Sequence, residues 1–288
     1  MTKIAFLGLG VMGYPMAGHL TKHDFDVVVY NRTLEKAQKW QSEFDGEYVN
    51  TPKQAASKAS VVCLCVGNDD DLRSVMYGEE GVIAGLQSGD VVIDHTTTSA
   101  KVAREMADVC ADKGAHFLDA PVSGGQAGAE NGQLTVMMGG DAAVYQKVTP
   151  ILNSYSRFHK LLGKAGSGQL AKMMNQICIA GVVQGLAEAL SFGKNAGLDC
   201  AEVVEVISKG AAQSWQMENR YQTMLQGEYE FGFAVDWMRK DLQIALDEAR
   251  TNGSTLALTA LVDQYYADVQ KLGGGRWDTS SLLARICE

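Results

Sequence analysis

The feature that most constrains the fold is a glycine-rich run that directly follows the first apolar segment, residues 4–7, and opens a helical pattern. In a strand–turn–helix unit, the first glycine of such a run permits a tight turn, the second lets the backbone approach a phosphate, and the third lets the helix pack against the strand. The amino end of the helix offers N–H groups to the phosphate. The alternative is a purely structural turn. The predicted phosphate-binding residues are Gly8, Gly10, Val11, Met12 and Gly13.

Short β-branched segments alternate with longer helical patterns through the first half of the chain. This alternation is typical of βαβ units, which form a parallel sheet covered by helices. In doubly wound sheets, ligands bind beyond the carboxyl ends of the strands. The sequence therefore predicts an α/β domain with a Rossmann-type doubly wound sheet and a site along these strand ends. The six predicted strands are residues 4–7, 27–30, 61–66, 91–94, 116–119 and 134–138.

The pattern changes near residue 163, beyond which the β-rich segments stop and every later segment is best interpreted as helix. We predict a nucleotide-binding domain over residues 1–163 and an all-α domain over residues 164–288. A long, largely apolar helix is expected to join them. The helices predicted most clearly are residues 169–195, 201–209, 237–251 and 256–272.

The charge and the cysteines restrict the class of protein. A formal net charge of -9, without a long run of Lys or Arg, argues against nucleic acid or an anionic membrane as a partner. Six cysteines without CxxC spacing, most of them in apolar runs, are typical of structural thiols in a reducing compartment. No secretory leader and no membrane-spanning window is identified. We therefore predict a cytoplasmic protein without a metal site.

The end of the second predicted strand indicates which nucleotide is bound. A site selective for NAD usually places Asp or Glu there, to accept a hydrogen bond from the ribose 2′-hydroxyl. This chain has Asn31, Arg32 and Thr33 instead, and all three can donate to a 2′-phosphate. NADP(H) is therefore favoured over NAD(H). The alternatives are that Arg32 is merely solvated and that Thr33 caps the next helix.

A turn after the fifth predicted strand has the groups needed to bind a carboxylate. Pro121 restricts the chain there, and it is followed by Ser123, Gly124 and Gly125. The two glycines expose backbone N–H groups beside the serine hydroxyl. The turn is therefore a candidate site for a carboxylate-bearing substrate, and the alternative is an ordinary tight turn.

Lys172 and Asn175 stand three positions apart in the predicted long helix, and hence on one of its faces. If Lys172 lies against a nicotinamide pocket, partial desolvation would lower the pKa of its ammonium and suit it to exchange a proton at neutral pH. Asn175 could orient the lysine or the substrate. The alternative is that Lys172 lies on the solvated face of the helix.

Four segments occur in the order and approximate spacing of a known family: GLGVMGYPMAGHL, DAPVSGGQAGAENGQLTVMMGG, GSGQLAKMMNQ and RKDLQIAL. They resemble the β-hydroxyacid dehydrogenase family, which includes 3-hydroxyisobutyrate dehydrogenases, tartronate semialdehyde reductases and glyoxylate/succinic semialdehyde reductases. The resemblance spans essentially the full chain. It implies a Rossmann domain, a helical domain, and hydride transfer between nicotinamide and a small 3-hydroxy acid or semialdehyde.

The resemblance also implies roles for particular residues. Lys172 would be the catalytic acid/base, with Asn175 beside it, and residues 123–125 would hold the substrate carboxylate. Thr96 matches the family's hydroxyl residue near nicotinamide and substrate. Lys240 would close the site from the helical domain. Succinic semialdehyde, glyoxylate, tartronate semialdehyde, methylmalonate semialdehyde and serine-like hydroxy acids all fit such a site.

Two other functions are possible on the same scaffold. Imine reductases of the family often replace the catalytic lysine, so Lys172 argues against that activity. A non-catalytic NADP-binding sensor would be indicated by loss of Lys172 or by an appended basic module. The sequence keeps Lys172 and shows no such module.

Three further features have more than one interpretation. His95 is expected to be a hydrogen-bonded loop residue rather than a second acid. Trp215 and Phe231 could shape substrate choice or pack in the core. The helical domain has few polar inserts, which favours a homodimer or homotetramer.

Overall fold

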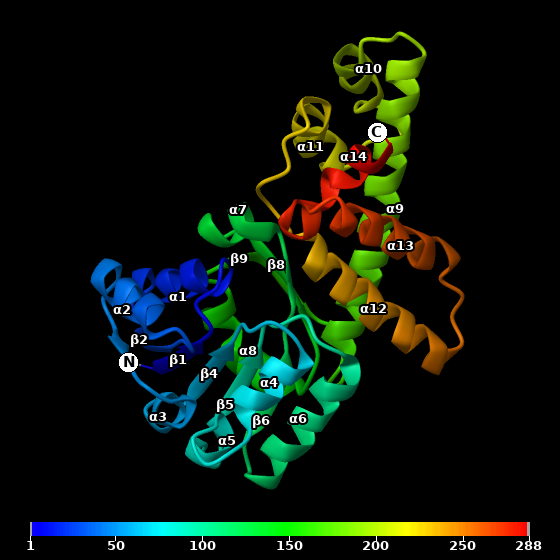
Figure 1. Ribbon diagram of the computed structural model, residues 1–288. Helices are drawn as coiled ribbons and strands as arrows, with labels where there is room; N and C mark the ends of the chain where they lie inside the picture. The colour runs from blue at the N-terminus through cyan, green and yellow to red at the C-terminus, as the bar shows by residue number, and fades with distance from the viewer. Residues whose placement is uncertain (1, 287–288) are drawn as a thin grey trace. The chain divides into compact units, whose positions relative to one another are not determined.

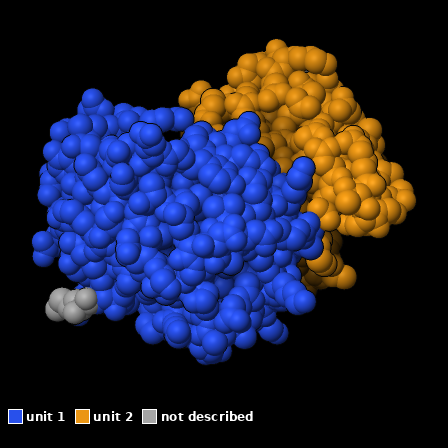
Figure 2. All heavy atoms as spheres, turned by 90° about the horizontal axis from the view of Figure 1, so that it is seen from below, with its two compact units in different colours: residues 1–172 blue, residues 173–288 orange. Residues whose placement is uncertain are grey.

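The computed structural model describes residues 2–286 and divides into two compact units, residues 1–172 and residues 173–288 (Figure 2). The division falls inside one helix, α9 (Ser167–Asn195). The boundary predicted at residue 163 stays a prediction, since a helix that runs through both units offers no loop at which to divide them.

The first unit is built on a parallel sheet of six strands in the order β3-β2-β1-β4-β5-β6 (Figure 1). The order reverses direction between β1 and β4, as in Rossmann-type doubly wound folds. The predicted α/β fold class is therefore confirmed. The strands are β1 (Lys3–Leu7), β2 (Asp26–Tyr30), β3 (Glu47–Tyr48), β4 (Val61–Leu64), β5 (Val91–Asp94) and β6 (His116–Asp119).

Alternate residues of the central strands pack in two hydrophobic cores, one on each face of this sheet. In β1, Ile4 and Phe6 pack in the core formed with α1, α2 and α8, whereas Ala5 and Leu7 pack in the core formed with α3, α4, α5 and α6. Burial on both faces explains the continuous apolar runs of these strands. The helices are α1 (Gly13–Lys22), α2 (Leu34–Glu43), α3 (Pro52–Ser57), α4 (Asp69–Met76), α5 (Val82–Gly85), α6 (Ala100–Asp112) and α8 (Ala142–Leu152).

The sixth predicted strand, residues 134–138, does form, but it belongs to a separate sheet. As β8 (Leu134–Met138) it pairs in antiparallel fashion with β7 (Val122–Ser123) and in parallel with β9 (Ser156–Leu161). The short helix α7 (Gly125–Glu130) connects β7 with β8. The expectation that this segment would extend the parallel sheet was therefore wrong, because the chain turns back after β6 at the Ser123–Gly125 segment.

The second unit is helical in the part that the structure describes, as predicted. Its core is formed by α9 together with the helices that follow it. By length and composition α9 could cross a membrane, contrary to expectation, but Val183, Leu186 and Leu190 are buried in this core. We therefore interpret α9 as a core helix. The later helices are α10 (Cys200–Ile207), α11 (Trp215–Gln226), α12 (Val235–Asn252), α13 (Ala257–Lys271) and α14 (Leu282–Ile286).

The cysteines within residues 2–286 form no disulfide bond with one another. Burial raises the pKa of Cys63 and of Cys110 to about 12, so both are poor nucleophiles. Cys178 is exposed on α9. The sixth cysteine, Cys287, lies outside the described residues.

Candidate active site

The glycine-rich turn between β1 and α1 has the geometry of a phosphate-binding turn. Gly8 has a φ of +98°, and a Cβ there would collide with the carbonyl oxygen of Cys65. A Cβ on Gly13 would collide with the carbonyl oxygen of Gly8, so this glycine allows the helix to approach the strand. A Cβ on Gly10, in contrast, would meet no atom within 4 Å, and the neighbouring Val11 is exposed. The turn is therefore packed at its first and third glycines and open at its second, which fits a dinucleotide pyrophosphate.

The end of β2 lies beside this turn. Asn31 accepts a hydrogen bond from Leu9 N (2.9 Å) and donates one to Thr33 O (2.9 Å), so its amide holds the glycine turn against β2. Arg32 and Thr33 are exposed, and Thr33 occupies the N-cap position of α2 without a side-chain cap hydrogen bond. Arg32 forms an ion pair with Asp71 at 3.3 Å. Of the three predicted 2′-phosphate ligands, Arg32 and Thr33 therefore present their polar groups to solvent.

Thr96 lies in the loop after β5, two residues beyond Asp94. Its hydroxyl accepts a hydrogen bond from Val66 N (3.0 Å), and its own N–H donates to Asp94 Oδ1 (3.0 Å). Gln169, in the first turn of α9, binds the same loop by donating to Thr96 O (2.7 Å) and accepting from Thr98 N (3.0 Å). The Gln169 side chain thus joins the Thr96 loop to the helix that carries Lys172.

Asp119, at the end of β6, is fully buried and holds the start of α9. Its two carboxylate oxygens accept hydrogen bonds from Gly166 N (2.8 Å) and Gln169 N (2.9 Å). Burial raises the pKa of Asp119, and these donors oppose that rise because they favour the ionised form. A Cβ on Gly139 or Gly168 would collide with Asp119, which explains why both positions are glycine. Sequence reasoning gave no role to Asp119 or Gln169.

Lys172 lies one helical turn beyond Gln169 and is buried, with 7% of its surface exposed. Its Nζ donates a hydrogen bond to Val122 O at 2.9 Å. The next three residues are Ser123, Gly124 and Gly125, the predicted carboxylate ligands, and the two glycines have φ values of +133° and +61°. The structure therefore brings the predicted proton donor to the predicted carboxylate-binding turn, and Lys172 does not lie on a solvated helix face.

His95 is a buried, hydrogen-bonded loop residue, as the sequence interpretation favoured. Its Nδ1 donates to Ala120 O (2.8 Å), because a carbonyl oxygen can only accept, and Tyr155 OH then donates to Nε2 (3.0 Å). The ring also stacks on Phe6. Burial lowers the pKa of His95 to about 4, so the imidazole stays neutral at physiological pH.

This shift predicts a change in the pH dependence of folding. His95 binds a proton below pH ~6.5 in the unfolded chain but only near pH 4 in the folded protein, so its contribution to stability is present above pH ~6.5 and is lost as pH falls towards 4. Between pH 7 and pH 5 the loss is about 2 kcal/mol. His95→Asn lacks this titrating group. When pH falls from 7 to 5, the free energy of unfolding of the variant, relative to that of the wild type, should therefore rise by about 2 kcal/mol, measured by urea unfolding at both pH values.

The neighbouring Asp94 makes the comparison with the variant necessary. Burial raises the pKa of Asp94 to about 7, so its contribution favours the folded state at low pH and is lost as pH rises through 7. The two contributions oppose each other in the wild type. An unchanged difference between variant and wild type at the two pH values would contradict the assignment of a neutral His95.

In the second unit, two hydrogen bonds and one ion pair connect Asn175 with Lys240. Asn175 donates to Gln176 Oε1 (2.8 Å), and Gln176 donates to Asp241 Oδ2 (2.6 Å). Asp241 in turn pairs with the Lys240 ammonium at 3.1 Å, and this ammonium also lies 5.6 Å from the ring centre of Trp237. The approach of Lys240 to Lys172 stays a prediction, because Lys240 lies in the other unit.

Trp215 and Phe231 contact the same arginine. The Arg220 guanidinium lies 4.8 Å from the Trp215 ring centre and 5.1 Å from that of Phe231. Arg220 also pairs with the buried Asp278 at 3.2 Å. Trp215 is about half exposed (52%), so these aromatic residues form a cation–π cluster at the surface of the second unit rather than part of its core.

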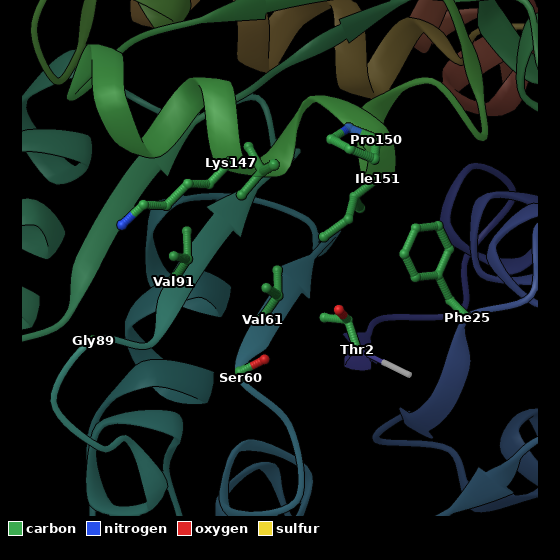
Figure 3. A pocket seen from close by; sticks show the side chains of 10 residues that line it. Thr2, Phe25, Ser60, Val61, Gly89, Val91, Lys147, Pro150 and Ile151 are labelled. Atoms are coloured by element: carbon green, nitrogen blue, oxygen red, sulfur yellow. The ribbon is translucent and has the colours of Figure 1, made fainter.

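A hollow of about 280 Å³ in the first unit lies away from all of these groups. Its lining includes Thr2, Ser60 and Gly89, which precede β1, β4 and β5 (Figure 3). The hollow is thus at the amino ends of the strands, whereas the glycine turn, Thr96 and Ser123 follow their carboxyl ends. Within residues 2–286, no group of three or more His, Cys, Asp or Glu side chains could hold a metal ion.

Two family models match successive parts of the chain. The NAD binding domain of 6-phosphogluconate dehydrogenase matches residues 3–173, and the NAD-binding domain of NADP-dependent 3-hydroxyisobutyrate dehydrogenase matches residues 166–286. The first match covers more than half of the chain and contains both the glycine turn and Lys172.

Individual relatives match over almost the full length. An uncharacterized oxidoreductase of Shewanella frigidimarina is 64% identical over 99% of this chain and 98% of its own. The 2-hydroxy-3-oxopropionate reductase of Escherichia coli is 30% identical over 99% of this chain and 97% of its own. The structure of 3-hydroxyisobutyrate dehydrogenase from Mycobacterium tuberculosis with L-serine is 27% identical, has a TM-score of 0.89 and covers 100% of both chains. The chain therefore belongs to the β-hydroxyacid dehydrogenase family, and it is an NAD(P)-dependent oxidoreductase of the 3-hydroxyisobutyrate dehydrogenase type.

Proposed function

We propose that this protein is an NADPH-preferring reductase of small semialdehydes that carry a carboxylate, and that Lys172 is its acid/base. The observation that carries the proposal is the buried Lys172 ammonium, 2.9 Å from Val122 O and next to the Ser123–Gly125 turn. A buried lysine that is held beside donors for a carboxylate is suited to transfer a proton to a bound substrate.

The residues divide the chemistry between them. Bound NADPH would supply the hydride that reduces the carbonyl carbon. Lys172 would protonate the carbonyl oxygen as negative charge develops on it, and in the oxidative direction its neutral amine would accept the hydroxyl proton. The Ser123–Gly125 turn would bind the carboxylate and so orient the carbonyl group. The family resemblance implies that Thr96, Asn175 and Lys240 would contact the substrate. It also implies that Thr96 and Lys240 would contact the cofactor.

The cofactor preference is supported by the end of β2. Arg32 and Thr33 present donors there, and the segment lacks the carboxylate that accepts the hydrogen bond of a ribose 2′-hydroxyl in NAD-selective sites. The substrate class is supported by the named relatives, a 2-hydroxy-3-oxopropionate reductase and a 3-hydroxyisobutyrate dehydrogenase, whose names both denote small carboxylate-bearing compounds.

Initial rates on a panel of semialdehydes, each with NADPH and with NADH, test the proposal. The panel contains glyoxylate and the succinic, tartronate and methylmalonate semialdehydes, with a cyclic imine as a separate arm. We expect turnover of at least one semialdehyde at a higher kcat/KM with NADPH. Turnover of the imine alone would instead indicate an imine reductase, and nucleotide binding without any turnover would indicate a sensor.

A homo-oligomeric, cytoplasmic enzyme is part of the same proposal. Met174, Val182 and Phe192 are exposed on one face of α9, together with Cys178. An exposed apolar stripe of this length is unusual for a monomer, and a second copy of the helix would offer a stripe of the same composition. Sedimentation equilibrium should therefore give a mass of two or four chains. A monomer at micromolar concentration would contradict it.

A further inference from the structure

The ion pair between Arg32 and Asp71 joins two strand ends that are not neighbours. Arg32 follows β2, and Asp71 lies in the first turn of α4, which follows β4. Between β2 and β4 the sheet contains β1, and the glycine turn after β1 fits a dinucleotide pyrophosphate. The two side chains therefore meet at the edge of the sheet where the glycine turn lies. The Arg32 side chain is 86% exposed and the Asp71 side chain 32% exposed.

We propose that Asp71 is a specificity-determining residue, which weakens NADPH binding by competing with the 2′-phosphate for Arg32. This inference rests on the proposed function, in which Arg32 is a ligand of that phosphate. The oxygen and the nitrogen of the Asn31 side-chain amide are both hydrogen-bonded to backbone groups. Arg32 is the one residue of the Asn31–Thr33 segment that carries a positive charge. A carboxylate paired with this guanidinium cancels much of its charge and repels a phosphate brought to the same place.

Asp71 keeps its position independently of Arg32. Its backbone N–H donates to Asn68 Oδ1 (2.8 Å), the N-cap of α4, and its carbonyl oxygen accepts from Ser74 Oγ (2.8 Å). The preceding Asp69 is bound by the N–H and hydroxyl groups of Ser99. The Asp71 backbone is therefore fixed, and replacing its carboxylate by an amide should leave the helix intact.

The expected effect follows from the charges and the solvent around them. Asp71→Asn removes one negative charge that lies 3.3 Å from the guanidinium proposed to bind the 2′-phosphate. At a solvated site this is worth about a three- to tenfold decrease in the Kd for NADPH, and less at high salt. NADH has no 2′-phosphate, so its Kd should change by less than about twofold.

Isothermal titration calorimetry of the full-length protein with NADPH and with NADH tests the proposal without a substrate. The matched control is Asp70→Asn, which removes the same charge from the same helical turn, but Asp70 pairs with Arg73 (3.6 Å) instead of Arg32. We expect tighter NADPH binding in Asp71→Asn and not in Asp70→Asn. In the background of Arg32→Ala, Asp71→Asn should tighten NADPH binding less than it does in the wild-type background.

Other outcomes separate this inference from the proposed function. Equal tightening of both nucleotides, weaker NADPH binding, or the same change in Asp70→Asn would overturn the role of Asp71. If the wild type binds NADH more tightly but Asp71→Asn still tightens NADPH, the proposed cofactor preference is wrong and the role of Asp71 stands. If the wild type binds neither nucleotide, both are overturned.

Discussion

Lys172→Ala is expected to lower kcat for semialdehyde reduction by about 10²- to 10⁴-fold, the usual contribution of a general acid. The Lys172 ammonium lies beside the Ser123–Gly125 turn, where the substrate carboxylate is proposed to bind, and alanine offers neither its proton nor its charge. The rate should be measured at saturating NADPH, with the best semialdehyde of the panel. The Kd for NADPH, which is proposed to depend mainly on the glycine turn and Arg32, should change little.

Lys164→Ala is the matched control, because Lys164 is an exposed lysine that lies shortly before the same helix. It should keep nearly the wild-type kcat. A thermal melt of both variants separates loss of chemistry from loss of fold. If Lys172→Ala keeps its kcat, or if the loss appears only as a higher KM, Lys172 is not the proton donor of the reaction.

The glycine turn could be predicted from sequence because its constraints are local. Gly8 must adopt a positive φ, and Gly13 must let α1 approach the turn, so few other residues fit either position. Five of the six strands of the parallel sheet were predicted for a similar reason, since burial on both faces requires continuous apolar runs, whereas the two-residue strand β3 was missed. Lys172 also stood out, as a charged residue in an otherwise apolar helical segment.

The second sheet could not be predicted, because its strands carry weak local signals. The segment Ser156–Leu161 is largely exposed, and it contains two basic residues that mask the alternation of a strand. β7 has two residues, too few for any period to be recognised. The segment Leu134–Met138 was identified as a strand, but the sheet that it joins depends on these weak partners.

Asp119 and Gln169 were missed because their partners are backbone groups. Gly166 N and the backbone of Thr96 and Thr98 carry no sequence signature, so only the fold shows that Asp119 holds the start of α9 and that Gln169 joins the Thr96 loop to α9. The available signal was indirect. A polar residue three positions before Lys172, in a helix that is otherwise apolar, requires a partner when it is buried.

Asp119→Ala is expected to destabilise the first unit by about 2–4 kcal/mol. The substitution leaves Gly166 N and Gln169 N buried without acceptors, and each such group costs about 1–3 kcal/mol. Burial disfavours the ionised Asp119 carboxylate, as its raised pKa indicates, so removing this group offsets part of the loss in stability. For a unit of this size the melting temperature should fall by roughly 5–15 °C, measured by differential scanning calorimetry.

The same substitution should also lower kcat, because Asp119 fixes the first turn of the helix that carries Lys172. A misplacement of about 1 Å at a reacting group can cost on the order of 10²-fold in rate. Asp119→Asn should recover only part of both losses, since one amide oxygen replaces two acceptors and its NH₂ group then faces an N–H donor. The control is Asp112→Ala, at an exposed position at the end of α6, where neither quantity should change. If Asp119→Ala melted at the wild-type temperature, the hydrogen bonds from Gly166 and Gln169 would not hold the start of α9, and the position of Lys172 would need another cause.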